Sequence, residues 1–208
     1  MKAPFPKNEA RRIEILWQYD ILDTPPEKSF DELTSLAAYI CEAPVALISL
    51  VDENRQWFKS KVGLSLKETN RDISMCAHAI LQKGLTIVPD TTQDVRFKDN
   101  PFVVSEPKIR FYAGAPLITP SGLVLGTLCV IDKVPRRLTK DQKEALGILS
   151  RHVVAQLELR RQSRELGRSR TDCEQLKKDL AKARAEIKKL RAGKTSKTGR
   201  LPARQPRR

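Results

Sequence analysis

Apolar residues that recur every three or four positions predict two amphipathic helices at the start of the chain. The first lies between residues 8 and 19, and its apolar positions are Ile13, Leu16 and Trp17. Pro25 and Pro26 end this segment. The second helix is expected to begin at Ser29, because Ser29 and Glu32 have the spacing of an N-terminal capping box. Its apolar face consists of Leu33, Leu36, Ala37 and Ile40.

Runs of β-branched and apolar residues predict two β-hairpins in the middle of the chain. Residues 44–51 have the pattern of a buried strand, and residues 55–61 pair back across a turn of acidic residues and Asn. Residues 109–117 and 123–131 form the second hairpin, and a shorter run at residues 85–88 adds one more strand.

A short helix and a long polar loop separate the two hairpins. Ser74 is placed to cap a helix that runs to about Leu81. The loop of residues 89–107 is rich in charged residues. Loops of this length are commonly functional, so we expect this one to contribute to a binding site.

A very long helix is predicted from a second capping box, formed by Thr139 and Gln142, to Arg191. At about 1.5 Å per residue it would measure roughly 80 Å. It carries two apolar stripes. One consists of Leu146, Leu149, Val153 and Leu157. The other is a heptad seam that includes Ile148 and Leu159 and continues through Leu166, Ser169, Cys173, Leu176, Leu180, Ala183, Ile187 and Leu190.

The two stripes predict two partners for this helix. One stripe is expected to pack on the sheet, while the other meets a second chain. A heptad seam with no partner in its own chain favours a parallel homodimer held by a coiled coil. The alternative is a solvated single helix, stabilised by the helix propensity of Lys, Arg and Glu alone.

The net charge of +14 is not spread evenly along the 208 residues. Residues 1–150 carry 20 Lys and Arg against 19 Asp and Glu, whereas residues 151–208 carry 19 against 6. The globular part is therefore nearly neutral. Residues 192–208 have the composition of a disordered basic tail, which predicts weak contact with nucleic acid or an anionic surface without sequence recognition. The alternative is a tail that only improves solubility.

Several protein classes are excluded by what the sequence lacks. The longest apolar runs, residues 45–51 and 123–131, are too short for a membrane span. No secretory signal is visible, so a cytoplasmic location is expected. Four irregularly spaced cysteines and two histidines argue against a disulfide framework and a zinc site. No metal or other cofactor is therefore expected.

Six stretches of the sequence carry a resemblance to a known family. They are ILDTPPEKSFDELTSLAA (21–38), ISLVDENRQWFKSKVGL (48–64), SMCAHAIL (74–81), VPDTTQDVRFKDNPFV (88–103), IRFYAGAPL (109–117) and GTLCVID (126–132). In this order they resemble the GAF domain, specifically the bacterial sensory type found ahead of histidine kinases and diguanylate cyclases. Several long matches in the right order are more specific than any single short motif.

This resemblance implies an α+β fold: the GAF fold, an antiparallel sheet of about six strands with the terminal helices on one face. The other face forms a pocket that in many relatives holds a small molecule. We therefore divide the chain into a GAF domain (9–162), a coiled-coil helix (163–191) and the basic tail (192–208). GAF domains are usually sensory or dimerisation modules rather than catalysts.

Residues from the short helix, the long loop and the strand at 109–117 are expected to converge over the sheet. The candidate ligand-binding residues are Trp57, Arg71, Cys76, His78, Asp90, Arg96, Phe97, Arg110 and Tyr112. The arginines would anchor an anionic or carbonyl group, and the aromatic residues would supply a flat wall. Local alternatives are ion pairing with Asp94 and Asp99 for Arg96, and a turn bond for Asp90.

Cys76 is the most reactive candidate, because the first turn of a helix favours a thiolate. His78 points to a different side of that helix, which argues against a Cys–His catalytic pair. Cys41 and Cys129 are expected to be buried core thiols. If Cys76 and Cys129 face one another, however, a thiol switch becomes available. Phytochrome-like relatives attach a bilin beside an Asp-Ile-Pro stretch, and cyclic-nucleotide-binding relatives carry an Asn-Lys-Phe-Asp-Glu signature; this sequence has neither.

The sequence therefore predicts a non-enzymatic regulatory protein, without catalytic residues, that binds a small molecule or a partner and signals through a dimeric coiled coil. Two alternatives remain: a thiol-based redox enzyme of the free methionine sulfoxide reductase kind, and a polyanion-associated scaffold that acts through the basic tail. The sequence identifies neither the ligand nor the downstream partner.

Overall fold

The structure, a computed structural model, describes residues 2–195 of the chain. Contacts divide the chain into two units, residues 1–161 and 162–208. The first unit is built on one six-stranded antiparallel sheet. Its strands are β1 (Val45–Val51), β2 (Arg55–Val62), β3 (Glu68–Asn70), β4 (Thr86–Val88), β5 (Phe111–Ile118) and β6 (Val124–Asp132).

The strands follow the order β3-β2-β1-β6-β5-β4, so β1 and β6 lie side by side at the centre of the sheet. Both predicted hairpins form, β1 with β2 and β5 with β6. The short edge strand β3 was not predicted, because its three residues, Glu-Thr-Asn, contain no apolar alternation. The predicted α+β fold with about six antiparallel strands is confirmed.

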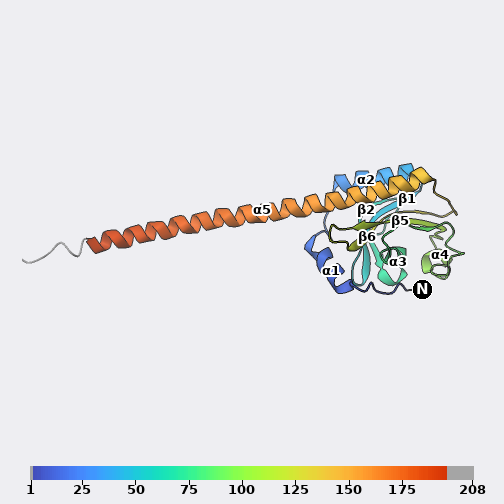
Figure 1. Ribbon diagram of the computed structural model, residues 1–208, viewed down its shortest axis with the longest axis horizontal. Coiled ribbons are helices and arrows are strands. Elements are labelled where there is room, and N and C mark those ends of the chain that lie inside the picture. The colour runs from blue at the N-terminus through green and yellow to red at the C-terminus, as the bar shows by residue number, and fades with distance from the viewer. Residues whose placement is uncertain (1, 196–208) are drawn as a thin grey trace, which may run out of the picture. The chain divides into compact units, whose positions relative to one another are not determined.

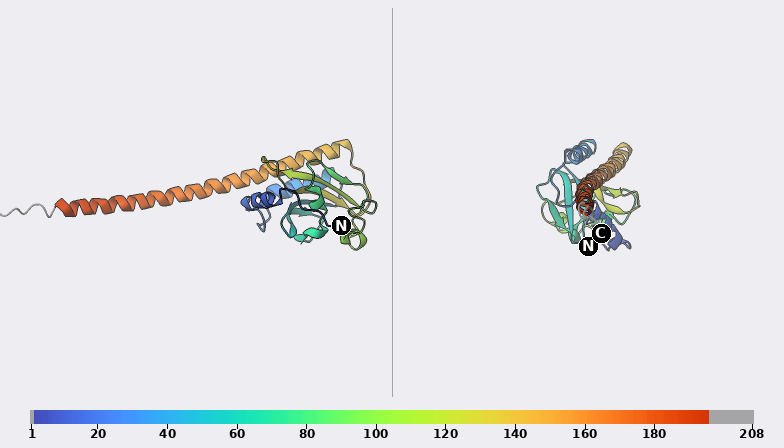
Figure 2. Two further views of the ribbon diagram at one scale, coloured as in Figure 1. Left: turned by 60° about the horizontal axis from the view of Figure 1, so that its bottom comes forward. Right: turned by 90° about the vertical axis from the view of Figure 1, so that its left-hand side faces the viewer.

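Helices cover both faces of the sheet (Figures 1 and 2). On one face, called the helix face below, lie α2 (Lys28–Ile40) and the first part of α5 (Lys140–Thr195). On the other lie α3 (Met75–Ala79), preceded by the 3-10 turn η1 (Arg71–Ile73), and α4 (Pro101–Val104). The N-terminal helix α1 (Glu9–Gln18) adds Leu16 to the core of the helix face.

A continuous apolar cluster fills the space between the sheet and the helices of the helix face. The α5 residues that join it are Leu146, Leu149, Val153 and Leu157, each no more than 6% exposed. This is one of the two predicted stripes, and its packing on the sheet is confirmed. The capping box of α5 also forms, because Gln142 N donates to Thr139 Oγ1 and Thr139 N donates to Gln142 Oε1.

The capping box predicted for α2 is wrong. The helix begins at Lys28 with Glu27 as its N-cap, so Ser29 lies inside the first turn and no side-chain hydrogen bond caps the helix. The carboxylate of Glu27 is held elsewhere, since it accepts from Lys59 Nζ at 2.6 Å and from Arg160 Nε at 2.9 Å. We infer that tertiary ion pairs set the start of α2, rather than local capping.

Lys59 of β2 has a fully buried side chain on the helix face. Its ammonium also donates to Thr24 Oγ1 at 2.9 Å and to the carbonyl oxygen of Pro25 at 2.7 Å. A buried ammonium is tolerated only when it is paired and hydrogen-bonded. Lys59, Glu27 and Arg160, the Lys59 network, therefore tie the sheet to the segment before α2 and to α5.

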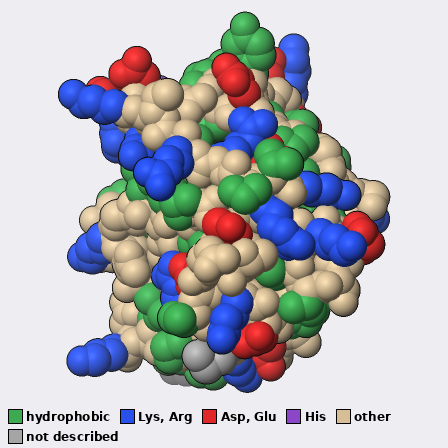
Figure 3. All heavy atoms as spheres, turned by 90° about the vertical axis from the view of Figure 1, so that its right-hand side faces the viewer, with side chains coloured by type: hydrophobic (Ala, Val, Ile, Leu, Met, Phe, Trp, Pro, Cys, Tyr) green, Lys and Arg blue, Asp and Glu red, His purple; other side chains and the backbone are tan. Residues whose placement is uncertain are grey.

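Charges of both signs are mixed on the surface of the domain. Figure 3 shows one face, on which Lys and Arg side chains lie interspersed with Asp and Glu. This pattern agrees with the near-neutral charge of residues 1–150. A face of this kind creates no single-sign field that would attract a polyanion.

The second unit contains the rest of α5. Its seam residues Leu166, Leu176, Leu180 and Ile187 are between 50% and 72% exposed in the single chain. The coiled coil at 163–191 remains a prediction. Because α5 continues to Thr195, the first residues of the predicted tail are helical; residues 196–208, and the polyanion contact predicted for them, lie outside the described residues. None of the described helices combines the length and apolarity that a membrane span requires.

Replacing Lys59 by Met tests the network on the helix face. We expect the free energy of unfolding to fall by about 1–3 kcal/mol, because the hydroxyl of Thr24 and the carbonyl of Pro25 lose their buried donor, while Glu27, which is 36% exposed, keeps Arg160. Chemical denaturation measures this change. Lys28→Met is the matched control: Lys28 is exposed and pairs with exposed Glu32, so the loss should stay below about 0.5 kcal/mol. Equal losses in the two variants would contradict the importance of the network.

Candidate functional site

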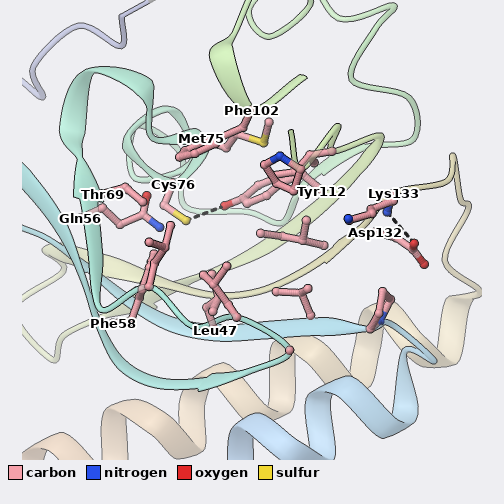
Figure 4. Close-up of a pocket in the computed structure, with 18 of the residues that line it drawn as sticks. Leu47, Gln56, Phe58, Thr69, Met75, Cys76, Phe102, Tyr112, Asp132 and Lys133 are labelled. Atoms are coloured by element: carbon pink, nitrogen blue, oxygen red, sulfur yellow. Dashed lines mark hydrogen bonds between the residues drawn. The ribbon is translucent and has the colours of Figure 1, made fainter. Parts of the chain in front are cut away.

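A cavity of about 560 Å³ lies over the face of the sheet opposite α2 and α5 (Figure 4). The sheet lines it with Leu47, Phe58, Tyr112 and Ile131 from four different strands. Met75 of α3 and Phe102 of α4 line it from the other side. Most of the lining is therefore apolar.

Polar lining groups gather in two places. Gln56 and Thr69 lie beside Cys76 in Figure 4, and the hydroxyl of Ser74 donates to Gln56 Oε1. The other place holds the carboxylates of Glu106 and Asp132 together with Lys133. Glu106 and Lys133 are largely exposed and mark the part of the cavity that faces solvent. An apolar interior with a few polar groups suits a small molecule with an apolar body.

The alternation of side chains along β2 decides which residues reach the cavity. Gln56 and Phe58 line it, whereas Trp57 packs in the core of the helix face. This corrects the expectation of an aromatic wall that includes Trp57: its neighbour Phe58 occupies that place. Consecutive strand residues point to opposite faces, so the cavity side of β2 cannot be assigned to Trp57 or Phe58 until the register is fixed.

Cys76 is the only cysteine among the described residues that lines the cavity. Its Sγ accepts a hydrogen bond from Tyr112 Oη at 3.3 Å, drawn in Figure 4, and another from Thr127 Oγ1 at 3.1 Å. The Sγ atom of Cys129 lies 3.7 Å away. Ser74 caps α3 as the sequence predicts, because its Oγ accepts from the backbone N–H three residues later. Cys76 and Cys129 therefore do face one another.

The surroundings of Cys76 favour its ionised form. Burial raises the pKa of this thiol, but hydrogen bonds from Cys129 and from neighbouring hydroxyl groups outweigh burial and lower the pKa to about 7. The pKa of Cys129 is instead raised well above its ordinary value, by its hydrogen bond to Cys76 and by burial. Burial also raises the pKa of Cys41 to about 11. Among these three buried thiols, Cys76 is the one that ionises most readily.

Two of the candidate arginines lie outside the cavity lining and bind backbone or acidic groups. Arg71 donates to Glu9 Oε1 at 2.5 Å and to the carbonyl oxygen of Asp52 at 2.8 Å. Arg110 donates to the carbonyl oxygen of Val103 at 2.8 Å. These hydrogen bonds give both guanidinium groups a role in holding loops together.

The remaining candidates form local contacts elsewhere. Arg96 pairs with Asp94 at 2.6 Å, and its guanidinium stacks over Phe97 at 4.9 Å. The ring of His78 meets the ring of Phe97 edge-on, with centroids 4.9 Å apart. Asp90 accepts from the N–H and the hydroxyl of the residue two positions later, which is a turn bond. Of the nine candidates, the cavity lining includes Cys76 and Tyr112.

Most of the lining residues were not predicted from the sequence. They include Leu47, Gln56, Phe58, Met75 and Phe102. Their residue types are those of ordinary core positions, and charge or reactivity does not single them out. The alternation of side chains along the first hairpin was the signal that could have found them. Once one residue of the hairpin is placed on the cavity face, the alternation assigns its neighbours to one face or the other.

Comparison with known proteins agrees with the fold. A family model of the GAF domain matches residues 25–157. The GAF domain of an Acinetobacter phosphoenolpyruvate-protein phosphotransferase superposes with a TM-score of 0.55 at 16% identity, over 74% of this chain and 95% of that one. A type II free methionine-R-sulfoxide reductase from Thermoplasma acidophilum gives a TM-score of 0.50 at 12% identity, over 62% and 92%. At such low identity these two structures show the fold alone.

A protein named as a cyclic di-GMP phosphodiesterase, from Pseudomonas aeruginosa, is 48% identical over 133 residues. These residues make up 64% of this chain and 23% of that protein, so the chain matches under a quarter of its length. The finding corrects the expectation of a non-enzymatic protein, because a relative with this domain is named as an enzyme. A GAF domain of this type is therefore no argument against catalysis in the protein that carries it.

Gly114 of β5 leaves room for the hydroxyl of Tyr112, because a Cβ atom at Gly114 would clash with that hydroxyl and its ring. In Gly114→Ala we expect Tyr112 to move from Cys76, so that the pKa of the thiol rises and the free energy of unfolding falls by about 1–3 kcal/mol. Ultraviolet absorbance of the thiolate, followed during a pH titration, measures the pKa.

Tyr112→Phe is the matched variant, because it removes the same hydrogen bond without adding a Cβ atom at Gly114. Like Gly114→Ala, it should raise the pKa of Cys76. The free energy of unfolding should fall less than in Gly114→Ala. An unchanged thiol titration in both variants would contradict a role for Tyr112 in holding the charge on Cys76.

Proposed function

Because the chain belongs to the GAF domain family, we propose that residues 9–162 form a sensor domain whose cavity binds a small molecule with an apolar body. The cavity is the observation that carries this proposal. Protein interiors are usually close-packed, whereas ligand cavities measure about 300–1,000 Å³. A space of about 560 Å³ over the sheet falls within that range.

The proposed route from the cavity to α5 crosses the sheet through β2. Phe58 lines the cavity, and Lys59, the next residue, binds Glu27 on the helix face. Arg160 of α5 binds the same carboxylate. A ligand that displaces Phe58 would therefore also shift the ammonium that binds Glu27, and through this carboxylate it would act on Arg160 of α5. Such a switch needs the ligand to favour one arrangement by only a few kcal/mol.

The sequence relative supports a signalling role. We propose that this domain regulates an enzyme of cyclic di-GMP turnover, since the matched region of the P. aeruginosa phosphodiesterase is a GAF domain that makes up 23% of that protein. The proposal concerns regulation and assigns no step of hydrolysis to the residues of the cavity.

A homodimer is proposed for the second unit. Apolar side chains at heptad spacing, exposed in the single chain, are buried when two helices coil around each other. The seam residues Leu166, Leu176 and Leu180 have this spacing and this exposure. The stripe that packs on the sheet is a different one, so the seam is available to a second copy.

Anilinonaphthalene sulfonate, a fluorescent probe with apolar rings, tests the cavity in the full chain. We expect binding at one site per chain. Ile131→Trp fills the cavity and should weaken binding at least about tenfold, because the rings lose the space they occupy. Fluorescence titration measures the affinity.

Val134→Trp is the matched control for this titration. It adds the same side chain at a position that is 53% exposed and lies outside the cavity lining, so the affinity should stay that of the wild type. If neither variant affects the affinity, the probe does not bind in the cavity and the proposed site is wrong.

Light scattering tests the homodimer, and the full chain should show twice the monomer mass of 23.6 kDa. Leu176→Glu combined with Leu180→Glu should give a monomer, because charges replace two seam positions. The control combines Thr171→Glu with Gln175→Glu, which adds the same charge outside the seam and should leave the dimer intact. A wild-type chain with the monomer mass at micromolar concentration would refute the dimer.

A further inference from the structure

We propose that Cys76 and Cys129 form a reversible dithiol–disulfide pair that an organic hydroperoxide oxidises from the cavity. The proposal goes beyond reversible ligand binding, because it assigns a covalent reaction to the wall of the cavity. It rests on two buried sulfur atoms 3.7 Å apart, of which one belongs to a residue that lines the cavity.

The geometry gives the two thiols different positions. Cys76 lines the cavity, whereas Cys129 does not. Cys129 lies on β6 in the centre of the sheet, paired in register with Leu47 of β1 and Gly114 of β5. Both side chains are buried, with 1% of Cys76 and none of Cys129 exposed, so the difference between them is contact with the cavity lining. A molecule in the cavity therefore meets the sulfur of Cys76 first. Cys129 is within reach of Cys76 and protected from the molecule itself.

Hydrogen bonding prepares Cys76 for nucleophilic attack. Tyr112 and Thr127 both donate to its Sγ atom. Two donors that converge on one sulfur stabilise the thiolate, which is the nucleophilic form of cysteine. The pKa shifts agree with Cys76 as the nucleophile, since the pKa of Cys76 is lowered while the pKa of Cys129 is raised.

The reaction has two steps. The thiolate of Cys76 attacks the terminal oxygen of the hydroperoxide, an S–O bond forms, the O–O bond breaks, and the departing alkoxide takes a proton to become an alcohol. Cys76 is then a sulfenic acid. The sulfur of Cys129 attacks the sulfur of Cys76, an S–S bond forms, the S–O bond breaks, and the hydroxide leaves with the Cys129 proton as water. Two thiols and one hydroperoxide thus give one disulfide, one alcohol and one water.

The apolar lining favours an organic hydroperoxide over hydrogen peroxide. Leu47, Phe58 and Met75 lie around the cavity close to Cys76 (Figure 4). An alkyl or aryl group is stabilised by contact with such side chains, whereas hydrogen peroxide has no apolar part to bury.

Oxidation would also change the cavity wall. A disulfide has an S–S length of about 2.05 Å, so the two sulfur atoms must approach each other from their present separation. Cys76 belongs to α3 and Cys129 to β6, so the bond draws α3 toward the centre of the sheet. It also removes the thiolate to which Tyr112 donates. The oxidised and reduced chains are expected to differ in the shape of the cavity.

The other cysteines provide internal controls. Cys41 is buried in the core of the helix face, and its pKa is raised by burial. Cys173 is exposed on α5, away from the cavity lining. Cys173 lies on the heptad seam and is exposed only as long as the chain is single, and the proposal expects Cys76 to react before it.

The test treats the reduced full-length chain with cumene hydroperoxide and, separately, with hydrogen peroxide at equal concentration. The reaction is stopped by alkylation, and peptides are mapped by mass spectrometry. We expect a Cys76–Cys129 disulfide, formed faster with cumene hydroperoxide and before any change at Cys41 or Cys173. In Cys129→Ser, dimedone should trap a sulfenic acid on Cys76. In Cys76→Ser, Cys129 should stay unmodified, while Cys41→Ser should behave as the wild type.

Four results would overturn the proposal. One is oxidation of Cys173 ahead of Cys76 in the wild-type chain, a measurement that needs no variant to fold. Another is oxidation of Cys129 at the wild-type rate in Cys76→Ser. The third is oxidation of the Cys76–Cys129 pair by free methionine sulfoxide but not by the hydroperoxide. This result would indicate a methionine sulfoxide reductase instead. Failure of disulfide formation with probe binding intact rejects this inference and leaves the proposed sensor function standing.

Discussion

A single sheet with two buried faces imposes the constraint on which this structure depends. Residues of a strand alternate between two faces, one packed by helices and the other open to a cavity, except at irregularities such as the one in β2, where both Lys59 and Ser60 reach the helix face. In β2 this constraint places Phe58 against the cavity and Lys59 beneath α2 and α5. Because the ammonium of Lys59 is buried, it must keep its partners, and any movement of β2 acts on Glu27 and Arg160.

The two faces differ in how they are filled. On the helix face an apolar cluster reaches from the strands to α2 and α5. On the opposite face α3 has five residues and α4 has four, and a cavity of about 560 Å³ remains beside them. Small residues help to keep polar groups close to this space, as Gly114 does for the hydroxyl of Tyr112. The same face carries both the cavity and the thiol of Cys76.

Long-range sequence patterns predicted the fold well, while single-residue chemistry predicted the cavity lining poorly. Hairpins, the packed stripe of α5 and its capping box follow from apolar periodicity and local capping, and all three form. Ser29 fails as a cap because Glu27 is bound by Lys59, a residue 32 positions away. Arg71 and Arg96 were chosen for their charge, but each pairs with an acid that the fold or a turn brings close. The pairing of Arg96 with Asp94 is the local alternative that the sequence itself indicates, whereas the pairing of Arg71 with Glu9 joins residues 62 positions apart, which periodicity does not encode.

The most direct test of whether a ligand in the cavity affects the helix face is amide hydrogen exchange. Exchange is measured in β2 and in α5 at residues 140–161, with and without saturating anilinonaphthalene sulfonate. The account predicts altered exchange in β2 around Lys59 and in α5 around Arg160, and it predicts that Lys59→Met loses the α5 change. Altered exchange confined to the strands and helices that line the cavity, with α5 unchanged, would contradict it.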